Sequence, residues 1–250
     1  MPPNFVSGNA STLPEVLMVE RRPFGRLGCE DLGWLVARSH RGVVGRGGRC
    51  AGVWGRMQEF SDEEIAPAAG LPLQDRVNVE LVIYVSEGAI THRDSLGNEG
   101  RIEAGSVQVV SAGSGIRHAE YNLEQTPARI FRILFASDCP GSSPAWATQP
   151  CPAAVQPGGF VAIASGVVGD DDALPIRSNA RVLNAKLRVG QSAAHVLGVP
   201  RCAYLVPSTG IIVVNGLLIG ARDGAAIADM DVVTITAIED ADIVMVDVAS

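Results

Sequence analysis

The chain has 250 residues, of which 47% are hydrophobic and 19% charged, so it can bury a sizeable core and is not intrinsically disordered. Its formal net charge of -7 at pH 7 argues against a general nucleic-acid or anionic-membrane binder, because both surfaces repel a polyanion. Only 5% of the residues are aromatic, whereas glycine (28) and proline (15) are plentiful. This composition favours β structure with a core of small aliphatic side chains between many turns.

Residues 1–14 are rich in Asn, Ser, Pro and Gly and are predicted to form a flexible leader. The first residues lack the basic segment and apolar stretch of a signal peptide, and no run of eighteen apolar residues occurs. The five cysteines are scattered without a C-x-x-C pair, which argues against a zinc site. These features predict a cytoplasmic protein that binds neither nucleic acid nor membrane.

From residue 71 onward the chain consists of short β-type runs separated by turn residues, with no convincing amphipathic helix. The stretch 138–159 contains five prolines, so 141–159 is predicted to be a linker between two domains. Residues 15–140 then form the first domain and 160–250 the second. Within the second, the pair Asn215-Gly216 between two apolar runs predicts a two-residue hairpin, because both residues tolerate positive φ.

The two halves resemble one another. Residues 84–90 are followed by a hairpin and then by the apolar run 105–112, and residues 204–212 are followed by a hairpin and then by 229–237. Two copies of a short-stranded unit predict an all-β fold made of two antiparallel jelly-roll barrels packed together.

A dense pair of motifs lies in YVSEGAITHRDSLGNEGRIEAGSVQVVSAGSGIRHAEYN, residues 84–122. It contains the block E-G-x-[IV]-x-H-x-D-S-x-G-N, followed by A-G-x-x-Q-x-x-[ST]-A-G-x-G-[IV]-x-H-[AS]-E. In both motifs the chain resembles the pirin family, whose members are bicupins in the cupin superfamily. Weaker similarity in residues 32–40 and 178–181 extends the resemblance over most of 28–250, which implies two cupin domains.

The resemblance also implies a metal site that this chain has altered. Pirins hold a metal, usually iron, through a His-x-His pair on one strand of the first cupin and a His-x-Glu pair on a later one. The second pair matches His118 and Glu120, but the first pair falls on Gln74 and Arg76. Arginine stays protonated and offers only donors, and glutamine is a weak ligand for iron. The sequence therefore predicts that the metal is lost and that no cofactor is bound.

A buried carboxylate needs a positive partner, so Arg76 is predicted to pair with Glu120 near the vacated metal position, with His118 beside them. The predicted catalytic residues are Arg76, His118 and Glu120. The predicted substrate-binding residues are Gln74, Glu80 and His92. Glu80 is included because it lies an even number of residues from Arg76, so on a continuous strand its side chain would also point inward. For His92, a hydrogen bond within the sheet is the simpler role than contact with a substrate. His40 and His195 are predicted to be structural, and the second half, which has no H-x-H or H-x-E pair, is predicted to be a structural cupin.

Three functions follow from the resemblance. The altered site favours a metal-free derivative that binds a planar, oxygen-rich small molecule, phenolic or polyketide-like, and converts it by acid/base and electrostatic catalysis of the isomerase or cyclase type. The first alternative is a metal-dependent quercetin 2,3-dioxygenase-like enzyme, which would hold iron or another divalent metal. The second alternative is a non-catalytic regulatory binding protein. The sequence does not indicate the oligomeric state.

Overall fold

The computed structural model describes residues 18–40, 55–152, 159–198 and 200–249. These residues form twenty-two β-strands and one short 3-10 helix, η1 (Phe24–Arg26). No helix in these ranges is long and apolar enough to cross a membrane. The predicted leader 1–14 lies outside the described residues. The all-β prediction is confirmed, because the described residues form strands and a single short 3-10 helix.

The first cupin is built from two facing antiparallel sheets. The seven-stranded sheet has the order β12 (Ala145–Pro150), β9 (Ser106–Ser111), β6 (Val79–Glu87), β11 (Ala128–Ala136), β4 (Met57–Ile65), β3 (Leu35–Ser39) and β2 (Gly28–Asp31). The four-stranded sheet has the order β5 (Ala69–Arg76), β10 (Ile116–Asn122), β7 (Ala89–Asp94) and β8 (Glu99–Glu103). An apolar cluster that includes Leu81, Ile83 and Ile130 fills the space between them.

The second cupin repeats this plan. Its seven-stranded sheet has the order β1 (Met18–Arg22), β20 (Gly224–Ala228), β17 (Arg201–Thr209), β22 (Ala241–Ala249), β15 (Ala180–Leu187), β13 (Val161–Ser165) and β14 (Leu174–Pro175). Its four-stranded sheet has the order β16 (Ser192–Val196), β21 (Val232–Ala237), β18 (Ile212–Val214) and β19 (Leu217–Ile219). Asn215 (φ 44°) and Gly216 (φ 88°) form the predicted turn between β18 and β19.

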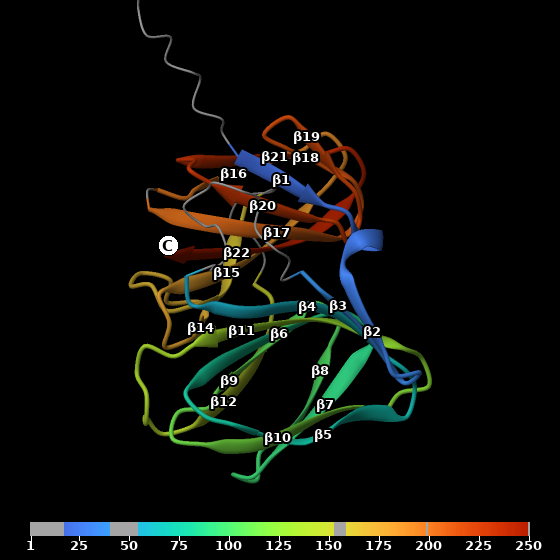
Figure 1. Cartoon of the computed structure of the whole chain (residues 1–250), viewed down its shortest axis with the longest axis vertical. Coiled ribbons are helices and arrows are strands. Elements are labelled where there is room, and N and C mark those ends of the chain that lie inside the picture. Colours follow the sequence, from blue (N-terminus) through green and yellow to red (C-terminus); the bar gives the residue numbers. More distant parts are fainter. Residues whose placement is uncertain (1–17, 41–54, 153–158, 199, 250) are drawn as a thin grey trace, which may run out of the picture.

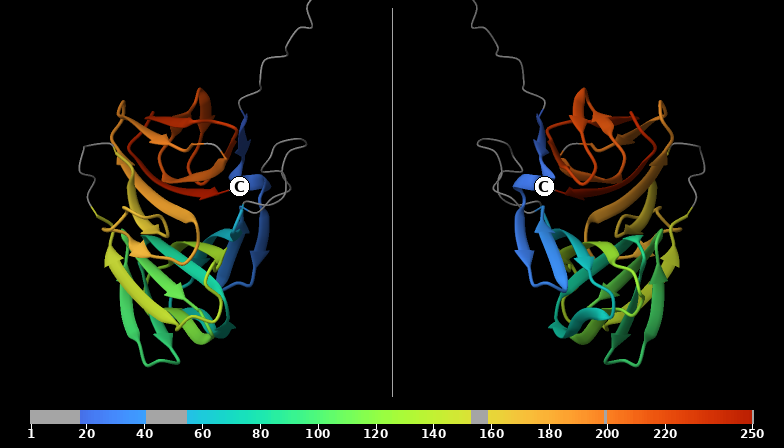
Figure 2. Two further views of the ribbon diagram at one scale, coloured as in Figure 1. Left: turned by 90° about the vertical axis from the view of Figure 1, so that its left-hand side faces the viewer. Right: turned by 90° about the vertical axis from the view of Figure 1, so that its right-hand side faces the viewer.

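The two seven-stranded sheets pack against each other, so the four-stranded sheets form the outer layers (Figures 1 and 2). Alternation along β6 shows the cause. Leu81 and Ile83 point into the first cupin, whereas Val82 and Tyr84 point into the core shared with the second cupin. Because both faces are buried there, central strands such as β6 and β22 are largely apolar.

Strand pairing relates the two cupins one to one. Strands β3 to β11 correspond, in sheet order, to β13 and β15 to β22, so that β4, β5 and β11 are equivalent to β15, β16 and β22. This correspondence accounts for the echo between the two halves of the sequence. The sheets do not close into continuous barrels, because each retains edge strands.

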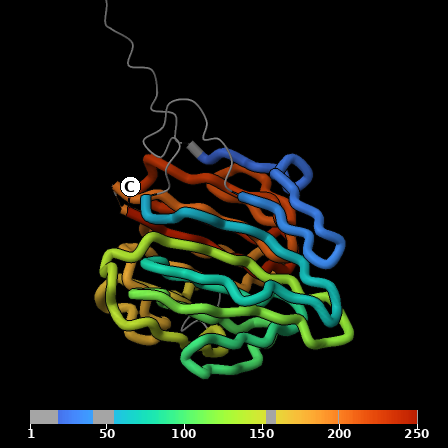
Figure 3. Tube along the Cα trace, turned by 60° about the horizontal axis from the view of Figure 1, so that its bottom comes forward, coloured from blue at the N-terminus to red at the C-terminus, as the bar shows by residue number. Residues whose placement is uncertain are grey.

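Two predicted domain boundaries need correction. β1, from the predicted first domain, pairs with β20 and so completes the second cupin (Figure 3). β12, inside the predicted linker 141–159, pairs with β9 and completes the first. Its proline content was misleading, because proline is tolerated on the edge strand of a sheet, where a missing N–H breaks no ladder.

An ion pair joins the two cupins. The Arg222 guanidinium donates to both carboxylate oxygens of Asp62, from Nε to Oδ2 at 2.6 Å and from Nη2 to Oδ1 at 2.8 Å. Asp62 is fully buried on β4, on the face opposite to its neighbours Ser61 and Glu63. Arg222 also stacks over the Phe24 ring, 4.1 Å from its centroid. Burial makes this pair matter more for stability than the exposed ion pairs do.

We expect Arg222→Met to lower the free energy of unfolding by about 3 kcal/mol, because it leaves the Asp62 carboxylate buried without a partner. Urea denaturation followed by tryptophan fluorescence measures the change. The exposed Arg188, which pairs with Asp240, provides the control, and Arg188→Met should barely move the midpoint. Equal effects of the two variants would contradict this account of the interface.

Candidate functional site

A cavity of about 440 Å³ opens in the first cupin between β2, β3, β4 and β5, with Arg132 of β11 at its base. Its polar lining residues are Glu30, Ser39, Glu59, Ser61, Glu63, Gln74, Arg76 and Arg132. The cavity is large enough for a small organic molecule.

A bulge in β5 sets the direction of its side chains. Glu120 on β10 pairs with Leu71, but His118, two residues earlier, pairs with Gln74, so β5 has one extra residue at Pro72–Leu73. Proline cannot donate to the ladder, which suits it to this position. The shift in parity turns Gln74 and Arg76 inward and leaves Leu73 exposed.

Glu120 pairs with Arg132, and not with Arg76 as predicted. Arg132 Nη1 donates to Glu120 Oε2 at 3.4 Å, and Arg132 Nε donates to Glu63 Oε1 at 2.9 Å. His118 Nε2 lies 3.2 Å from Glu120 Oε1 without the alignment of a hydrogen bond. Arg132 lies between two carboxylates on the inner face of β11, which the sequence analysis did not consider.

The ionisation of Glu120 follows from this arrangement. Burial alone would raise its pKa, but Arg132 above all, and then His118, lower the pKa to about 2. Burial also opposes the charge on Arg132, yet Glu63 and Glu120 together raise the pKa of that guanidinium. Glu120 is therefore ionised at neutral pH and is a poor proton acceptor there.

Arg76 is the cavity cation without a carboxylate partner among the described residues. Its Nη2 donates to Gln74 Oε1 at 2.6 Å, and its buried Nε has no hydrogen-bond partner. His118 lies behind this pair, fully buried and not part of the cavity lining. Its Nδ1 has no hydrogen-bond partner, and its Nε2 contacts only the Glu120 carboxylate among the described side chains. Such unpaired buried groups are costly unless something binds to them.

The predicted orientation of Glu80 is wrong. Asn78 has a φ of 54° between β5 and β6, and this change of direction breaks the parity that the prediction extended from Arg76. Glu80 shares the face of β6 that carries Val82 and Tyr84, away from the cavity. There it accepts a hydrogen bond of 2.5 Å from Ser111 Oγ.

His92 is buried beside His118 but does not line the cavity. Its Nε2 lies 3.2 Å from Asp94 Oδ2, and its ring stacks on Trp146 with centroids 5.0 Å apart. Burial lowers the pKa of His92, although Asp94 opposes the shift. These contacts favour a positioning role within the sheet.

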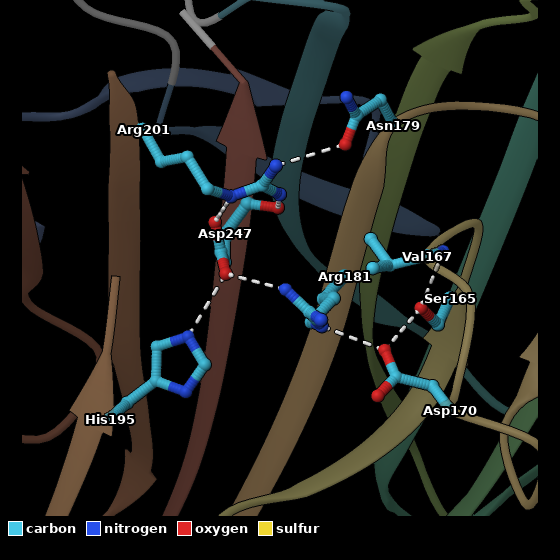
Figure 4. A network of polar contacts seen from close by, with 8 residues as sticks. All are labelled: Ser165, Val167, Asp170, Asn179, Arg181, His195, Arg201 and Asp247. Carbon is cyan, nitrogen blue, oxygen red and sulfur yellow. Dashed lines mark hydrogen bonds and ion pairs between the residues drawn. The ribbon is translucent and has the colours of Figure 1, made fainter. Parts of the chain in front are cut away.

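The other two histidines lie outside this site. His40 Nδ1 lies 3.0 Å from the Tyr204 hydroxyl, and burial, with Arg22 and Arg222 nearby, lowers the pKa of His40 to about 3, which suits a structural role. His195 has a carboxylate partner that the sequence analysis missed, Asp247 at 2.9 Å (Figure 4). The two are 52 residues apart in the chain, so local spacing could not reveal the pair.

The donor set around His118 does not fit a transition metal. Across the part of the chain that the structure describes, no group of three or more His, Cys, Asp or Glu side chains is arranged to hold one. On β5, facing His118, the side chains are an amide and a guanidinium. A guanidinium repels a cation at contact distance and has no lone pair to donate.

Sequence reasoning missed several cavity residues besides Arg132. Glu59, Ser61 and Glu63 alternate along β4 and face inward, with Ser61 Oγ donating to Glu63 Oε1 at 2.7 Å. Two signals were available: the i, i+2 spacing on β4, and the position of Arg132 between Phe131 and Ile133 in the apolar part of β11. Charged residues at such positions face either solvent or a site.

Comparison with known proteins identifies the family. The model of the pirin family matches residues 53–134, and that of the quercetinase C-terminal cupin domain matches residues 162–248. A pirin-like protein from Caulobacter vibrioides is 49% identical over 232 residues, which span 93% of this chain and all of the relative. The chain belongs to the pirin family. The resemblance seen in residues 84–122 is thereby confirmed.

More distant pirins share the fold. The crystal structure of YhhW from Escherichia coli superposes with a TM-score of 0.83 at 24% identity, covering 92% of this chain and 97% of YhhW. A nickel(II) complex of YhhW has also been solved. A quercetin 2,3-dioxygenase from Escherichia coli K12 is 27% identical over 192 residues, or 76% of this chain and 81% of that enzyme. The bicupin prediction is therefore confirmed.

The pKa of Glu120 predicts a specific acid dependence of stability. Because the folded-state pKa of about 2 lies below the ordinary value of 4.5, ionised Glu120 stabilises the folded state above about pH 4.5, and this contribution is lost as the pH falls towards 2. The difference in Tm between the wild type and Glu120→Gln should be constant above pH 5 and shrink below pH 4.5. Scanning fluorimetry from pH 2 to pH 7 measures it.

The exposed Glu87 supplies the control, since Glu87→Gln should give a small difference in Tm at every pH. A Glu120→Gln difference that stays constant down to pH 2 would mean that Glu120 does not carry this charge.

Proposed function

We propose that this pirin binds a planar, oxygen-rich small molecule, phenolic or polyketide-like, in the cavity of its first cupin and converts it by acid/base and electrostatic catalysis without a metal. The observation that carries the proposal is Arg76, a cavity-lining guanidinium with no carboxylate partner among the described residues. An anionic oxygen of a ligand, such as a phenolate or enolate, would supply the missing partner.

The chemical class of the ligand draws support from the relatives. The quercetin 2,3-dioxygenases of Escherichia coli and Acinetobacter baumannii are named for a flat, hydroxylated substrate. The cavity of this chain combines apolar walls, including Leu35 and Leu71, with polar groups at its base. Such a lining suits a flat ring system with oxygen substituents.

The roles proposed for the remaining site residues follow from their positions. Glu120 and Glu63 hold Arg132 at the base of the cavity and compensate its charge, which leaves Arg76 to meet the anionic oxygen. Gln74 orients Arg76 and offers its amide to the ligand. His118, whose Nδ1 has no hydrogen-bond partner and whose Nε2 contacts Glu120, is the proposed proton carrier, because ionised Glu120 is a poor base at neutral pH. His118 would have to reach the ligand past the Gln74 and Arg76 side chains.

A metal-free mechanism draws support from the donor set of the site. A first-row metal needs more ligands than His118 and Glu120 to compete with water, and the side chains opposite them are unsuited to a cation. The alternative is a metal-dependent dioxygenase like the relatives named for quercetin. It predicts that the purified protein contains stoichiometric metal, whereas the metal-free proposal predicts that it does not.

We expect Arg76→Met to weaken the binding of quercetin by about 10- to 100-fold, because a charge-assisted hydrogen bond is lost. Fluorescence titration of the full chain measures the affinity. Arg93→Met removes a half-exposed arginine on β7 and should leave the affinity unchanged. Equal affinities for the wild type and Arg76→Met would refute the role of Arg76, and stoichiometric metal with oxygen uptake would favour the dioxygenase.

Restoring the histidines should restore metal binding. In the double variant Gln74→His/Arg76→His, both new side chains lie on the inner face of β5 beside His118 and Glu120. We expect it to bind Ni(II) at least about tenfold more tightly than the wild type in calorimetry after treatment with chelator, because four ligands then converge.

The same strand offers the matched control. Leu73→His/Asp75→His places two histidines on the outer, exposed face of β5, and it should not reproduce the tight site. Tight nickel binding by the wild type itself would be inconsistent with a metal-free site.

A further inference from the structure

The second cupin has a cavity of its own, of about 510 Å³. It is formed by residues 159–162 at the start of β13, the loop 169–173 and residues 194–196 of β16. β13 and β16 are equivalent to β3 and β5, which line the cavity of the first cupin. The two cavities therefore occupy corresponding places in the two halves, although the second half lacks the motifs of the first.

An oriented imidazole lines this second cavity. His195 Nε2 lies 2.9 Å from Oδ2 of Asp247, which is fully buried (Figure 4). A carboxylate only accepts hydrogen bonds, so Nε2 carries the proton in neutral His195. The other nitrogen, Nδ1, lies on the edge of the ring away from Asp247. This nitrogen then presents a lone pair that can accept a hydrogen bond.

The arginines behind this imidazole are neutralised. Arg201 Nε donates to Asp247 Oδ1 at 2.5 Å, while Arg181 links Asp247 (3.5 Å) to Asp170 (2.7 Å). Ser165 Oγ also donates to Asp170 at 2.6 Å. The two positive charges are thus matched by two carboxylates, and neither arginine lines the cavity. The network holds His195 in place without making the cavity positive.

The lining of the cavity is acidic on one side and apolar on the other. Asp171 and Asp172 are exposed on the loop and form no ion pair with any described residue. Among the described residues, the lining contains no lysine or arginine that could neutralise these two carboxylates. The Phe160 ring packs edge-on against His195, with centroids 6.0 Å apart, and Val161 and Ala194 continue the apolar wall.

We propose that this cavity is a second binding site, which takes a small organic amine in its cationic form. The ammonium group donates to His195 Nδ1 and pairs with the carboxylates of Asp171 and Asp172, while the hydrocarbon part lies against Phe160. An anion is disfavoured by the carboxylates. A metal ion lacks a suitable group of three His, Cys, Asp or Glu ligands in the described ranges. This site is independent of the proposed function of the first cupin.

Three ligands of similar shape and different charge test the proposal on the full chain. They are 2-phenylethylamine, the neutral 2-phenylethanol and the anionic 3-phenylpropionate, each titrated by calorimetry. The amine should bind at least about tenfold more tightly than either of the others. Asp171→Asn/Asp172→Asn should weaken amine binding by about tenfold. His195→Phe should also weaken amine binding, and it should not strengthen the binding of 2-phenylethanol.

Glu99→Gln/Glu103→Gln removes the same charge from exposed positions on β8 of the first cupin and should leave amine binding unchanged. Because Asp171 and Asp172 are exposed, their variant should retain the Tm of the wild type, so a loss of binding reports on the site. The proposal fails if the amine binds no better than the alcohol. It also fails if Asp171→Asn/Asp172→Asn and the β8 variant have the same effect.

Discussion

Arg132 is the charge on which the interior of the first cupin depends. It lies between Ile130 and Leu134 on the inner face of β11 and compensates two buried carboxylates, Glu63 on β4 and Glu120 on β10. The ion triad therefore links the seven-stranded sheet to the four-stranded sheet across the interior. An interior ion pair is tolerated only when its partners are fixed and hydrogen-bonded, since desolvation otherwise exceeds the Coulombic gain. The geometry of the cavity base follows from this constraint.

The constraint also separates the roles of two arginines. With Arg132 engaged by Glu63 and Glu120, the cavity is left with Arg76 as a guanidinium held by an amide alone. A pirin with histidines at positions 74 and 76 would offer lone pairs to a cation. In this chain the same two positions offer N–H groups and positive charge, which disfavour a cation and support the proposed anionic oxygen as the ligand.

The fold and the family could be predicted from the sequence because both depend on local patterns: alternating strands, turn residues and the dense motif at residues 84–122. The motif placed Gln74 and Arg76 beside His118, but Glu120 was assigned to the wrong arginine. That partner lies on the next strand of the chain but in the facing sheet, and the sequence spacing does not reveal that the two side chains meet across the interior. Glu80 was misplaced because a single positive φ at Asn78 inverts the parity between two strands. Pairing and parity across a turn are tertiary properties.

The correspondence between the two cupins explains why sites arise at the same place in each. The equivalent strands β5 and β16 carry Arg76 and His195, respectively. The equivalent strands β11 and β22 carry Arg132 and Asp247. The equivalent strands β11 and β22 thus present a cation, Arg132, in the first cupin and an anion, Asp247, in the second. Each charge forms ion pairs with the residues around it. In the first cupin the arrangement leaves a guanidinium at the cavity, and in the second it leaves an imidazole nitrogen beside carboxylates. In the two proposals, the same frame therefore takes ligands of opposite charge.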